Sequence, residues 1–282
     1  MRILIVGGTS SLAQALRPIL SEFAEVVTAG RTGCDVRIDL TARVEKIELP
    51  KDIDVVVNAA ANYGGNSIEE MLQAENVNVL GTVKLCHACT KAKIMHLIQI
   101  SSIFACLDKS SPFYSMYSLS KKHAEEVAQL YCSRYALPLT ILRPSQFYGV
   151  GDAYRKHQPF LYSIIDKAAN DEDILIYGKN DALRNFIHVE DVAKIIALVI
   201  QRKIKGTYAC INTENVRYSE VAAAAIESFG STSTVRFIKE QPDIPNNIFE
   251  LDDSLYHLID YYPQISISLG MKKEAAFRKI TE

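Results

Sequence analysis

Short apolar runs alternate with longer segments of helix-like spacing through the first half of the chain. Runs such as Arg2–Val6 and Ile53–Val57 are nearly continuous and rich in β-branched residues, which is typical of buried strands. The segments between the runs are long enough for crossover helices, and this alternation predicts a Rossmann-like, doubly wound parallel α/β sheet. The further strands expected are Glu25–Ala29, Met95–Ile100 and a short one that ends at Asp39–Thr41.

The regular alternation stops after Leu139–Asp152, an apolar run that breaks into a glycine-rich loop. The segment Ala153–Asn180 is polar and basic in patches, and Leu183–Val192 is expected to return the chain to a helix. This change of pattern predicts a smaller C-terminal substrate-binding lobe beside the Rossmann domain. The expected boundaries are 1–150 plus about 186–212 for the Rossmann domain, and 151–185 plus 213–282 for the lobe.

Composition narrows the class of protein. The chain has 282 residues, 48% of them hydrophobic, and a net charge of -2, so it can bury a full core and has no basic run to grip nucleic acid. The opening apolar run, Ile3–Val6, is too short for a signal peptide or a membrane span. We therefore expect a cytoplasmic protein that binds neither nucleic acid nor membrane.

The six cysteines lie in apolar or helical segments without the spacing of a disulfide framework. Such usage in a chain of this length favours reduced, mostly packed thiols. The segment Cys86–Cys89 has a spacing that metals and redox centres use, but it falls within an expected helix and has no second Cys/His pair at ligand spacing. Core packing is therefore the preferred interpretation, and no metal site is predicted.

A hydroxyl and a Tyr-x-x-x-Lys pair form the candidate catalytic group. Ser102 follows the expected strand Met95–Ile100, and Tyr117 and Lys121 begin a segment free of Gly and Pro. Side chains four apart share one helix face, so the phenol and the ammonium can meet one ligand. A nearby ammonium is expected to lower the pKa of the phenol, which suits proton transfer at an oxygen. The alternative is an ordinary surface helix.

A glycine turn follows the first expected strand and opens a helix, where unpaired N–H groups can hold a dinucleotide pyrophosphate. The fingerprint is incomplete, because Ser10 and Ala13 stand where the second and third glycines after Gly7 would be. Any strand-to-helix turn remains the alternative. The candidate phosphate contacts are Gly7, Thr9, Ser10, Ser11 and Leu12.

The end of the second expected strand bears on the choice of cofactor. An acidic residue there would bind the ribose hydroxyls of NAD, whereas an arginine can pair with the 2′-phosphate of NADP. The chain has Arg31 at this point and no carboxylate before Asp35. NADP is therefore predicted, with NAD as the alternative if Arg31 is only a surface residue.

Nearly the whole chain resembles one family, the extended short-chain dehydrogenase/reductases of the NAD-dependent epimerase/dehydratase type, which act on nucleotide-activated sugars. The motifs that carry the resemblance are Tyr117–Lys121 with Ala124–Glu125, Leu142–Pro144 with Tyr148–Gly149, Arg184–Val189, and Asn78–Thr82. Their order along the chain matches the order in the family.

The resemblance implies roles for individual residues. Ser102, Tyr117 and Lys121 correspond to the catalytic triad, Arg184 to an arginine that pairs with the substrate diphosphate, and His188 to a packed structural histidine. Cys106 stands where the family usually has a tyrosine. The remaining implied contacts are Asp39, Leu40, Ala59, Ala60, Ala61, Tyr63, Ser101, Tyr117, Lys121, Pro144 and Phe147 for the cofactor, and Ser102 and Gln146 for the substrate.

The residues after the triad serine bear on the reaction. The family's 4,6-dehydratases resemble one another in an Asp-Glu pair at the positions of Ile103 and Phe104, so a dehydratase is disfavoured. We predict a ketoreductase that uses NADPH on a nucleotide-linked 4-keto-(6-deoxy)sugar, in the assembly of surface polysaccharide such as lipopolysaccharide. The alternatives are an NAD-dependent nucleotide-sugar 4-epimerase and a non-catalytic dinucleotide sensor. A homodimer formed through Val127, Leu130 and their neighbours is also expected.

Overall fold

The computed structural model describes residues 1–281 and divides them into two compact units, each described separately below. The first unit contains 1–144, 193–210 and 252–261, and the second contains 145–192, 211–251 and 262 onward. Both units are therefore assembled from separate stretches of sequence. Compared with the expected boundaries, residues 145–150, 186–192 and 211–212 fall in the second unit, and residues 252–261 fall in the first.

Within the described residues, seven parallel strands form the sheet of the first unit, in the order β3-β2-β1-β4-β5-β6-β11. The strand order reverses between β1 and β4, the switch point beside which doubly wound sheets bind ligands. The predicted Rossmann-like sheet is confirmed. Its strands are β1 (Arg2–Val6), β2 (Glu25–Gly30), β3 (Val36–Arg37), β4 (Val55–Asn58), β5 (His96–Ile100), β6 (Leu139–Pro144) and β11 (Gly206–Cys210).

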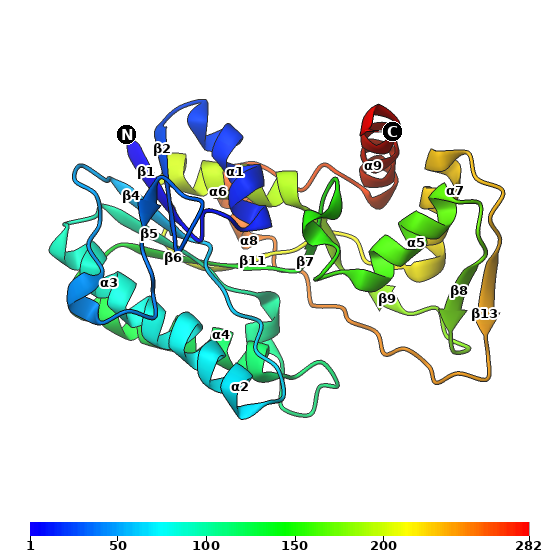
Figure 1. Cartoon of the computed structure of the whole chain (residues 1–282), viewed down its shortest axis with the longest axis horizontal. Helices are drawn as coiled ribbons and strands as arrows, with labels where there is room; N and C mark the ends of the chain where they lie inside the picture. Colours follow the sequence, from blue (N-terminus) through cyan, green and yellow to red (C-terminus); the bar gives the residue numbers. More distant parts are fainter. Residues whose placement is uncertain (282) are drawn as a thin grey trace. The chain divides into compact units, whose positions relative to one another are not determined.

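Helices cover both faces of this sheet, α3 and α4 on one side and α1 and α6 on the other (Figure 1). On the α3/α4 side, Leu4, Val56 and Leu97 of the strands pack with Cys86 and Cys89 in one buried cluster, so these two thiols belong to the core as predicted. The helices are α1 (Ser11–Ser21), α2 (Ile68–Ala74), α3 (Gly81–Lys91), α4 (Met116–Arg134), α6 (Val189–Arg202) and α8 (Ser254–Ile259), with 3₁₀ turns at Val44–Lys46 and Ile103–Cys106 and a π-helical turn at Glu75–Leu80.

Two expectations for the first unit differ from the structure. The third strand ends at Arg37 rather than at Thr41, because the Asp39 carboxylate accepts a hydrogen bond of 2.9 Å from the Thr41 amide and turns the chain. The helix expected to begin near Asn76 is preceded by α2, which starts after Ser67. Ser67 and Glu70 form a capping box there, so the helical path begins a full turn and more before the predicted point.

The second unit is built from short strand pairs and three longer helices. Strand β9 pairs with β12, β10 with β7, and β8 with β13. The prediction that Leu183–Val192 is one helix is wrong for its first half, because β9 and β10 pair with distant segments before α6 begins at Val189. The elements are β7 (Gln146–Tyr148), β8 (Ile174–Tyr177), β9 (Leu183–Arg184), β10 (Phe186–His188), β12 (Val216–Arg217), β13 (Val235–Ile238), α5 (Pro159–Ala169), α7 (Tyr218–Phe229) and α9 (Ile267–Thr281), with a 3₁₀ turn at Asp152–Tyr154.

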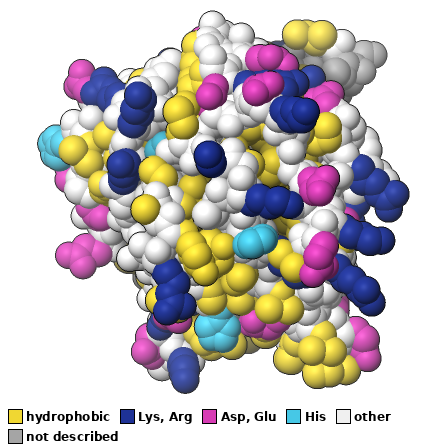
Figure 2. Space-filling view, turned by 90° about the vertical axis from the view of Figure 1, so that its left-hand side faces the viewer, with side chains coloured by type: hydrophobic (Ala, Val, Ile, Leu, Met, Phe, Trp, Pro, Cys, Tyr) yellow, Lys and Arg dark blue, Asp and Glu magenta, His cyan; other side chains and the backbone are white. Residues whose placement is uncertain are grey.

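The surface shown in Figure 2 carries basic and acidic side chains interspersed with apolar ones rather than gathered by sign. Such a mixed surface does not create a strong field of one sign on that face. Among residues 1–281, no helix combines the length and the apolar character that a membrane crossing needs.

Candidate functional site

The structure brings the three predicted catalytic side chains together at the carboxyl end of β5. Ser102 follows this strand, is buried, and caps a 3₁₀ turn by accepting a hydrogen bond of 3.2 Å from the Phe104 amide. Tyr117 lies in the first turn of α4, and its phenol interacts with the Ser102 hydroxyl. Lys121 follows one turn later on the same helix, as its spacing predicts.

Lys121 is buried to an unusual degree for a lysine, with 2% of its surface exposed. Its ammonium donates a hydrogen bond of 2.8 Å to the Ile100 carbonyl and lies 5.8 Å from the centroid of the Tyr117 ring. Burial lowers the pKa of Lys121 to about 8, against the opposite influence of the Glu125 carboxylate. This lysine can therefore change its charge in the range where enzymes work.

The pKa of Tyr117 moves opposite to the expectation from its lysine neighbour. Burial raises this pKa above the ordinary phenol value, the Tyr63 phenol raises it further, and the interaction with Ser102 opposes the rise. The prediction that Lys121 lowers the pKa of Tyr117 is therefore wrong. Burial removes the phenolate from water, and this effect is larger than the influence of the ammonium. The phenol is held in its protonated, proton-donating form.

A buried ionic network joins the end of β5 to α4 and β6. Ser101 donates a hydrogen bond to the Glu125 carboxylate, which also accepts one of 2.9 Å from Arg143 Nε. Glu125 comes one turn after Lys121 on α4, so the network fixes the helix that carries the catalytic pair. The Ser101 hydroxyl, predicted as a cofactor contact, is thus occupied by a structural bond.

The glycine turn after β1 approaches the end of β4 very closely. Gly7 has a φ of +82°, and a Cβ at this position would lie 2.6 Å from the Ala60 amide nitrogen, so only glycine fits. Ser10 caps α1 by accepting a hydrogen bond of 3.2 Å from the Ala13 amide. The turn and helix N-terminus therefore fit a dinucleotide pyrophosphate, although the Leu12 side chain is buried and only its backbone can face a ligand. Thr9 is exposed and Ser11 partly exposed.

Arg31 directly follows β2 and is exposed. The Asp35 carboxylate turns back onto β2, where it accepts hydrogen bonds of 2.8 Å from the amide and the hydroxyl of Thr28. Hydrogen bonds from Thr41, together with the charges of Arg31 and Arg37, lower the pKa of Asp39. The predicted adenine contact Leu40 is buried, and its carbonyl accepts a bond of 3.1 Å from Lys84.

The loop after β4 carries the predicted groove residues Ala59, Ala60, Ala61 and Tyr63. Ala59 and Ala60 are partly exposed and Ala61 is exposed, whereas the Tyr63 ring stacks on the ring of Tyr117 with centroids 4.7 Å apart. This stack brings a predicted cofactor residue directly against the predicted proton donor.

Asn78 holds this loop in place, a role that the sequence reasoning missed. Its side chain accepts a bond of 2.8 Å from the Asn62 amide and donates one of 2.7 Å to the Asn62 carbonyl. It also donates to the Ser120 hydroxyl at 2.9 Å, beside Lys121 on α4. The sequence did offer one sign of this role, because Asn78 begins one of the motifs shared with the family. In the structure Asn78 lies in a π-helical turn, a form that is frequent at functional sites.

In the second unit, Arg184 is 4% exposed and lies with its guanidinium over the ring of Tyr218, 4.8 Å from the centroid. Its nitrogens donate to Tyr218 Oη at 2.8 Å and to the carbonyls of Leu183 and Pro245 at 2.9 and 2.7 Å. The guanidinium is therefore fixed in orientation by its neighbours within the second unit.

Two further predicted residues of the second unit are also held by neighbours. The Gln146 amide donates to Gln158 at 3.0 Å and accepts from Asn247 at 3.2 Å. Phe147 belongs to β7, where its ring meets Tyr154 edge-on. The remaining predicted residue, Pro144, ends β6 in the first unit.

Two further motif residues differ in their surroundings. His188 is buried, its ring meets Tyr148 edge-on at 5.1 Å, and burial lowers its pKa. Cys106, by contrast, is exposed at the end of the 3₁₀ turn that follows Ser102. His188 thus packs among other side chains.

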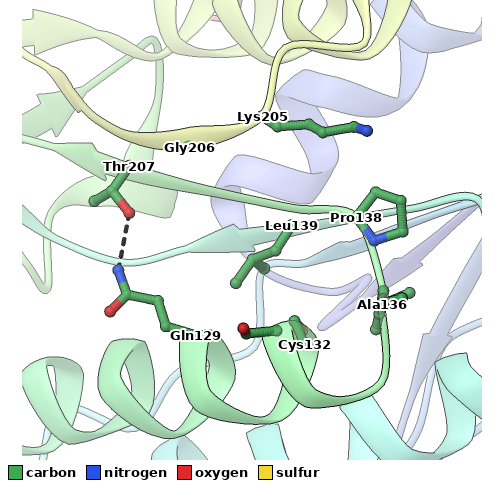
Figure 3. Close-up of a pocket in the computed structure, with 10 residues that line it drawn as sticks. Gln129, Cys132, Ala136, Pro138, Leu139, Lys205, Gly206 and Thr207 are labelled. Atoms are coloured by element: carbon green, nitrogen blue, oxygen red, sulfur yellow. Dashed lines mark hydrogen bonds between the residues drawn. The ribbon is translucent and has the colours of Figure 1, made fainter.

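A surface hollow of about 410 Å³ lies at the far end of α4, between this helix and the start of β6 and β11 (Figure 3). Cys132 and Lys205 border it. At its edge the Gln129 side chain donates a hydrogen bond of 3.1 Å to the Thr207 hydroxyl. Lys121 and Cys132 are separated by about 17 Å along the helix, at 1.5 Å per residue. None of the ten residues drawn around this hollow is a predicted site residue.

The chain is similar to several curated proteins, some of which are named for their action on nucleotide sugars. It is 24% identical over 269 residues to Protein CapI of Staphylococcus aureus, covering 84% of this chain and 79% of that protein. It is 31% identical over 170 residues to a putative UDP-glucose 4-epimerase of Methanocaldococcus jannaschii, and 28% identical over 164 residues to the dTDP-4-dehydro-6-deoxy-D-allose reductase of Streptomyces bikiniensis. Each of the latter two matches covers 56% of this chain and about half of the relative, 55% and 49% respectively.

Solved structures share the fold. The UDP-glucuronic acid 4-epimerase of Bacillus cereus in complex with NAD aligns with a TM-score of 0.79 and 21% identity over 100% of this chain and 99% of that one. WbmF of Bordetella bronchiseptica in complex with NADH aligns with a TM-score of 0.82 and 19% identity over 99% and 92%. The model of the NAD dependent epimerase/dehydratase family matches residues 3–210. The chain therefore belongs to the NAD-dependent epimerase/dehydratase family, and the relatives that it matches are nucleotide-sugar epimerases, dehydratases and reductases.

Proposed function

We propose that the protein reduces a nucleotide-linked 4-keto-(6-deoxy)sugar with NADPH, as a step in the assembly of surface polysaccharide. The observation that carries the choice of cofactor is the end of β2, where Arg31 is exposed and the next carboxylate along the chain, Asp35, is bonded back to Thr28. A guanidinium can pair with a 2′-phosphate, and a carboxylate turned away from that point offers no acceptor for ribose hydroxyls.

The state of the phenol supports reduction. Reduced nicotinamide, when bound, would supply the hydride to the carbonyl carbon. Ser102 would hold the carbonyl oxygen, and Tyr117, which burial keeps protonated, would donate its proton to that oxygen. The Lys121 ammonium would stabilise the phenolate that remains and then return a proton to it, and the neutral Lys121 amine would take up a proton from solvent.

The substrate class is supported by the relatives and by the second unit. The relatives named above include a dTDP-4-keto sugar reductase and a UDP-sugar epimerase, which share a nucleotide diphosphate on the substrate. Arg184 has a guanidinium that is already fixed by three hydrogen bonds, and planar guanidinium groups pair well with diphosphate oxygens. We assign Arg184 and Gln146 to the nucleotide part of the substrate.

A nucleotide-sugar 4-epimerase that retains NAD is the second candidate. The observation that favours it is the close structural likeness to an epimerase whose structure contains NAD. Epimerisation would use the same Ser102, Tyr117 and Lys121, so the end of β2 decides between the two candidates. The exposed Arg31 at that point suits NADPH rather than tightly held NAD.

Two further expectations belong to this proposal. We propose a cytoplasmic homodimer in which α4 contributes to the subunit contact, because Leu130 on this helix is 72% exposed. A non-catalytic sensor is disfavoured, because a sensor has no use for a hydroxyl, a phenol and an ammonium brought to one point.

The deciding experiment compares cofactor affinity in wild type and in Arg31→Asp. Wild type should bind NADPH more tightly than NADH by roughly ten- to a hundredfold, the value of a charge-assisted hydrogen bond to the 2′-phosphate. Arg31→Asp should reverse the preference, because it adds repulsion and supplies an acceptor for the ribose hydroxyl. Arg134→Asp, at an exposed arginine in the last turn of α4, is the matched control and should leave the preference unchanged. Tight, non-exchanging NAD in wild type would instead support the epimerase.

A further inference from the structure

We propose that Tyr63 is a positioning residue for proton transfer, which holds the plane of the Tyr117 ring by stacking on its face and shields that face from water. The inference rests on the proposed reaction and adds a residue to it. Tyr63 belongs to the loop after β4, and the sequence placed it only along the cofactor groove.

The geometry is that of a stacked aromatic pair. The two ring centroids lie 4.7 Å apart and the planes are inclined by 15°, within the range of favourable offset stacking. The outer partner, Tyr63, is 45% exposed, whereas Tyr117 is only partly exposed. Tyr63 is therefore placed as a cover, and removing its ring would open one face of Tyr117 to solvent.

The loop that carries Tyr63 is fixed to the catalytic helix. Asn78 binds both backbone groups of Asn62, at 2.8 and 2.7 Å, and reaches Ser120 of α4 at 2.9 Å. The Asn62 side chain accepts a further hydrogen bond of 2.8 Å from the Gly64 amide, which closes the turn around Tyr63. A residue held on both sides in this way can set the angle of the ring on which it stacks.

The stack has two consequences for proton donation. The phenol of Tyr117 can point at the carbonyl oxygen only while its ring keeps one orientation, and stacking resists rotation about the side-chain bonds. Burial raises the pKa of Tyr117, and the nearby Tyr63 phenol adds to that rise, so the cover also keeps the proton donor protonated.

Three variants separate these effects. Tyr63→Phe keeps the ring and should retain kcat within about twofold, whereas Tyr63→Ala should lower kcat by roughly tenfold with a smaller change in substrate KM. Tyr135→Ala is the matched control, because Tyr135 is also exposed and pairs with Tyr131 at 4.4 Å between centroids. It should change neither kcat nor KM.

A second measurement needs no turnover and therefore separates this inference from the proposed reaction. In protein labelled with ¹³C at the tyrosine Cε positions, the Tyr117 signals are assigned by their loss in Tyr117→Phe, and the rate at which this ring flips is measured by NMR line shapes. A faster ring flip in Tyr63→Ala, with Tyr63→Phe close to wild type, supports the role of Tyr63 even if the sugar substrate is wrong. A Tyr117 ring that flips no faster in Tyr63→Ala than in wild type, or a Tyr63→Ala enzyme with the kcat of wild type, overturns it.

Discussion

Lys121 in the first unit and Arg184 in the second are both cations with almost no access to solvent, 2% and 4% exposed. Lys121 donates one hydrogen bond to a carbonyl, at the end of β5, and burial lowers its pKa to about 8. Arg184 donates to two carbonyls and a phenol and rests on the aromatic ring of that phenol. The lysine is thus buried with few partners and the arginine with many.

This difference matches the two kinds of work proposed for the units. A sparsely satisfied ammonium can give up its proton near neutral pH, which suits a site where protons move. An arginine does not lose its proton in proteins, and a guanidinium held at several points presents a constant charge and a constant shape. Variants at or beside each cation test whether chemistry resides with the first and binding with the second.

The largest effect is expected from Tyr117→Phe, which removes the proton donor beside Lys121 and keeps the ring. Turnover should fall by roughly 10²- to 10⁴-fold, while cofactor affinity stays within about twofold. Steady-state kinetics and fluorescence titration of the cofactor check the two parts. Tyr131→Phe, on the same helix, should retain full activity. A Tyr117→Phe enzyme close to the wild-type rate would place the chemistry elsewhere.

An intermediate effect is expected from Arg184→Lys, which keeps a positive charge but loses the planar fork. The substrate KM should rise by roughly ten- to a hundredfold, because the shorter-headed lysine loses the fixed position from which the guanidinium can donate to the diphosphate, with kcat and cofactor affinity unchanged. Arg217→Lys, at an exposed arginine of β12 in the same unit, is the control. Loss of cofactor affinity with an unchanged KM would remove the proposed division between the two cations.

The smallest effect concerns stability and follows from the pKa of Lys121. Because this pKa is lowered from 10.5 to about 8, the unfolded chain holds more protons than the folded protein between these values. The free energy of unfolding of wild type should therefore rise with pH relative to Lys121→Met, by about 1 kcal/mol between pH 7.5 and 9. Urea denaturation at both pH values measures this difference.

Lys122→Met, at the exposed neighbouring lysine, should show no such pH dependence relative to wild type. If the curves of wild type and Lys121→Met run parallel across this range, Lys121 is as solvated as its neighbour. The comparison with Arg184 would then have no basis.

The first unit was largely predictable because each of its strands can be recognised from its own local sequence. Parallel strands that are buried on both faces have continuous apolar sequences. Ser102 and Tyr117 are close in sequence, at the end of β5 and at the start of α4. The sign of the Tyr117 pKa shift was not predictable, because burial is a property of the assembled fold. The Tyr63 stack depends likewise on a loop that Asn78 fixes from the π-helical turn.

The second unit was less predictable because its contacts join distant stretches of chain. Strand β9 pairs with β12, and Arg184 also forms an isolated β-bridge with Asn247. No local spacing therefore reveals that residues 183–188 form strands. The fixed orientation of Arg184 depends on Tyr218 and Pro245, which lie far along the sequence. A motif can identify such an arginine, but only the fold shows what holds it.

The position of β11 at the edge of the sheet has a consequence for biosynthesis. Strand β6 ends at Pro144, but its outer neighbour begins only at Gly206, after the first long segment of the second unit. At about 5–20 residues per second, a nascent chain carries β6 as an unpaired edge for several seconds. During that time the unpaired backbone groups of β6 can pair with other chains. A chain that is released before Gly206 has been added would therefore carry an open sheet edge and be prone to aggregation.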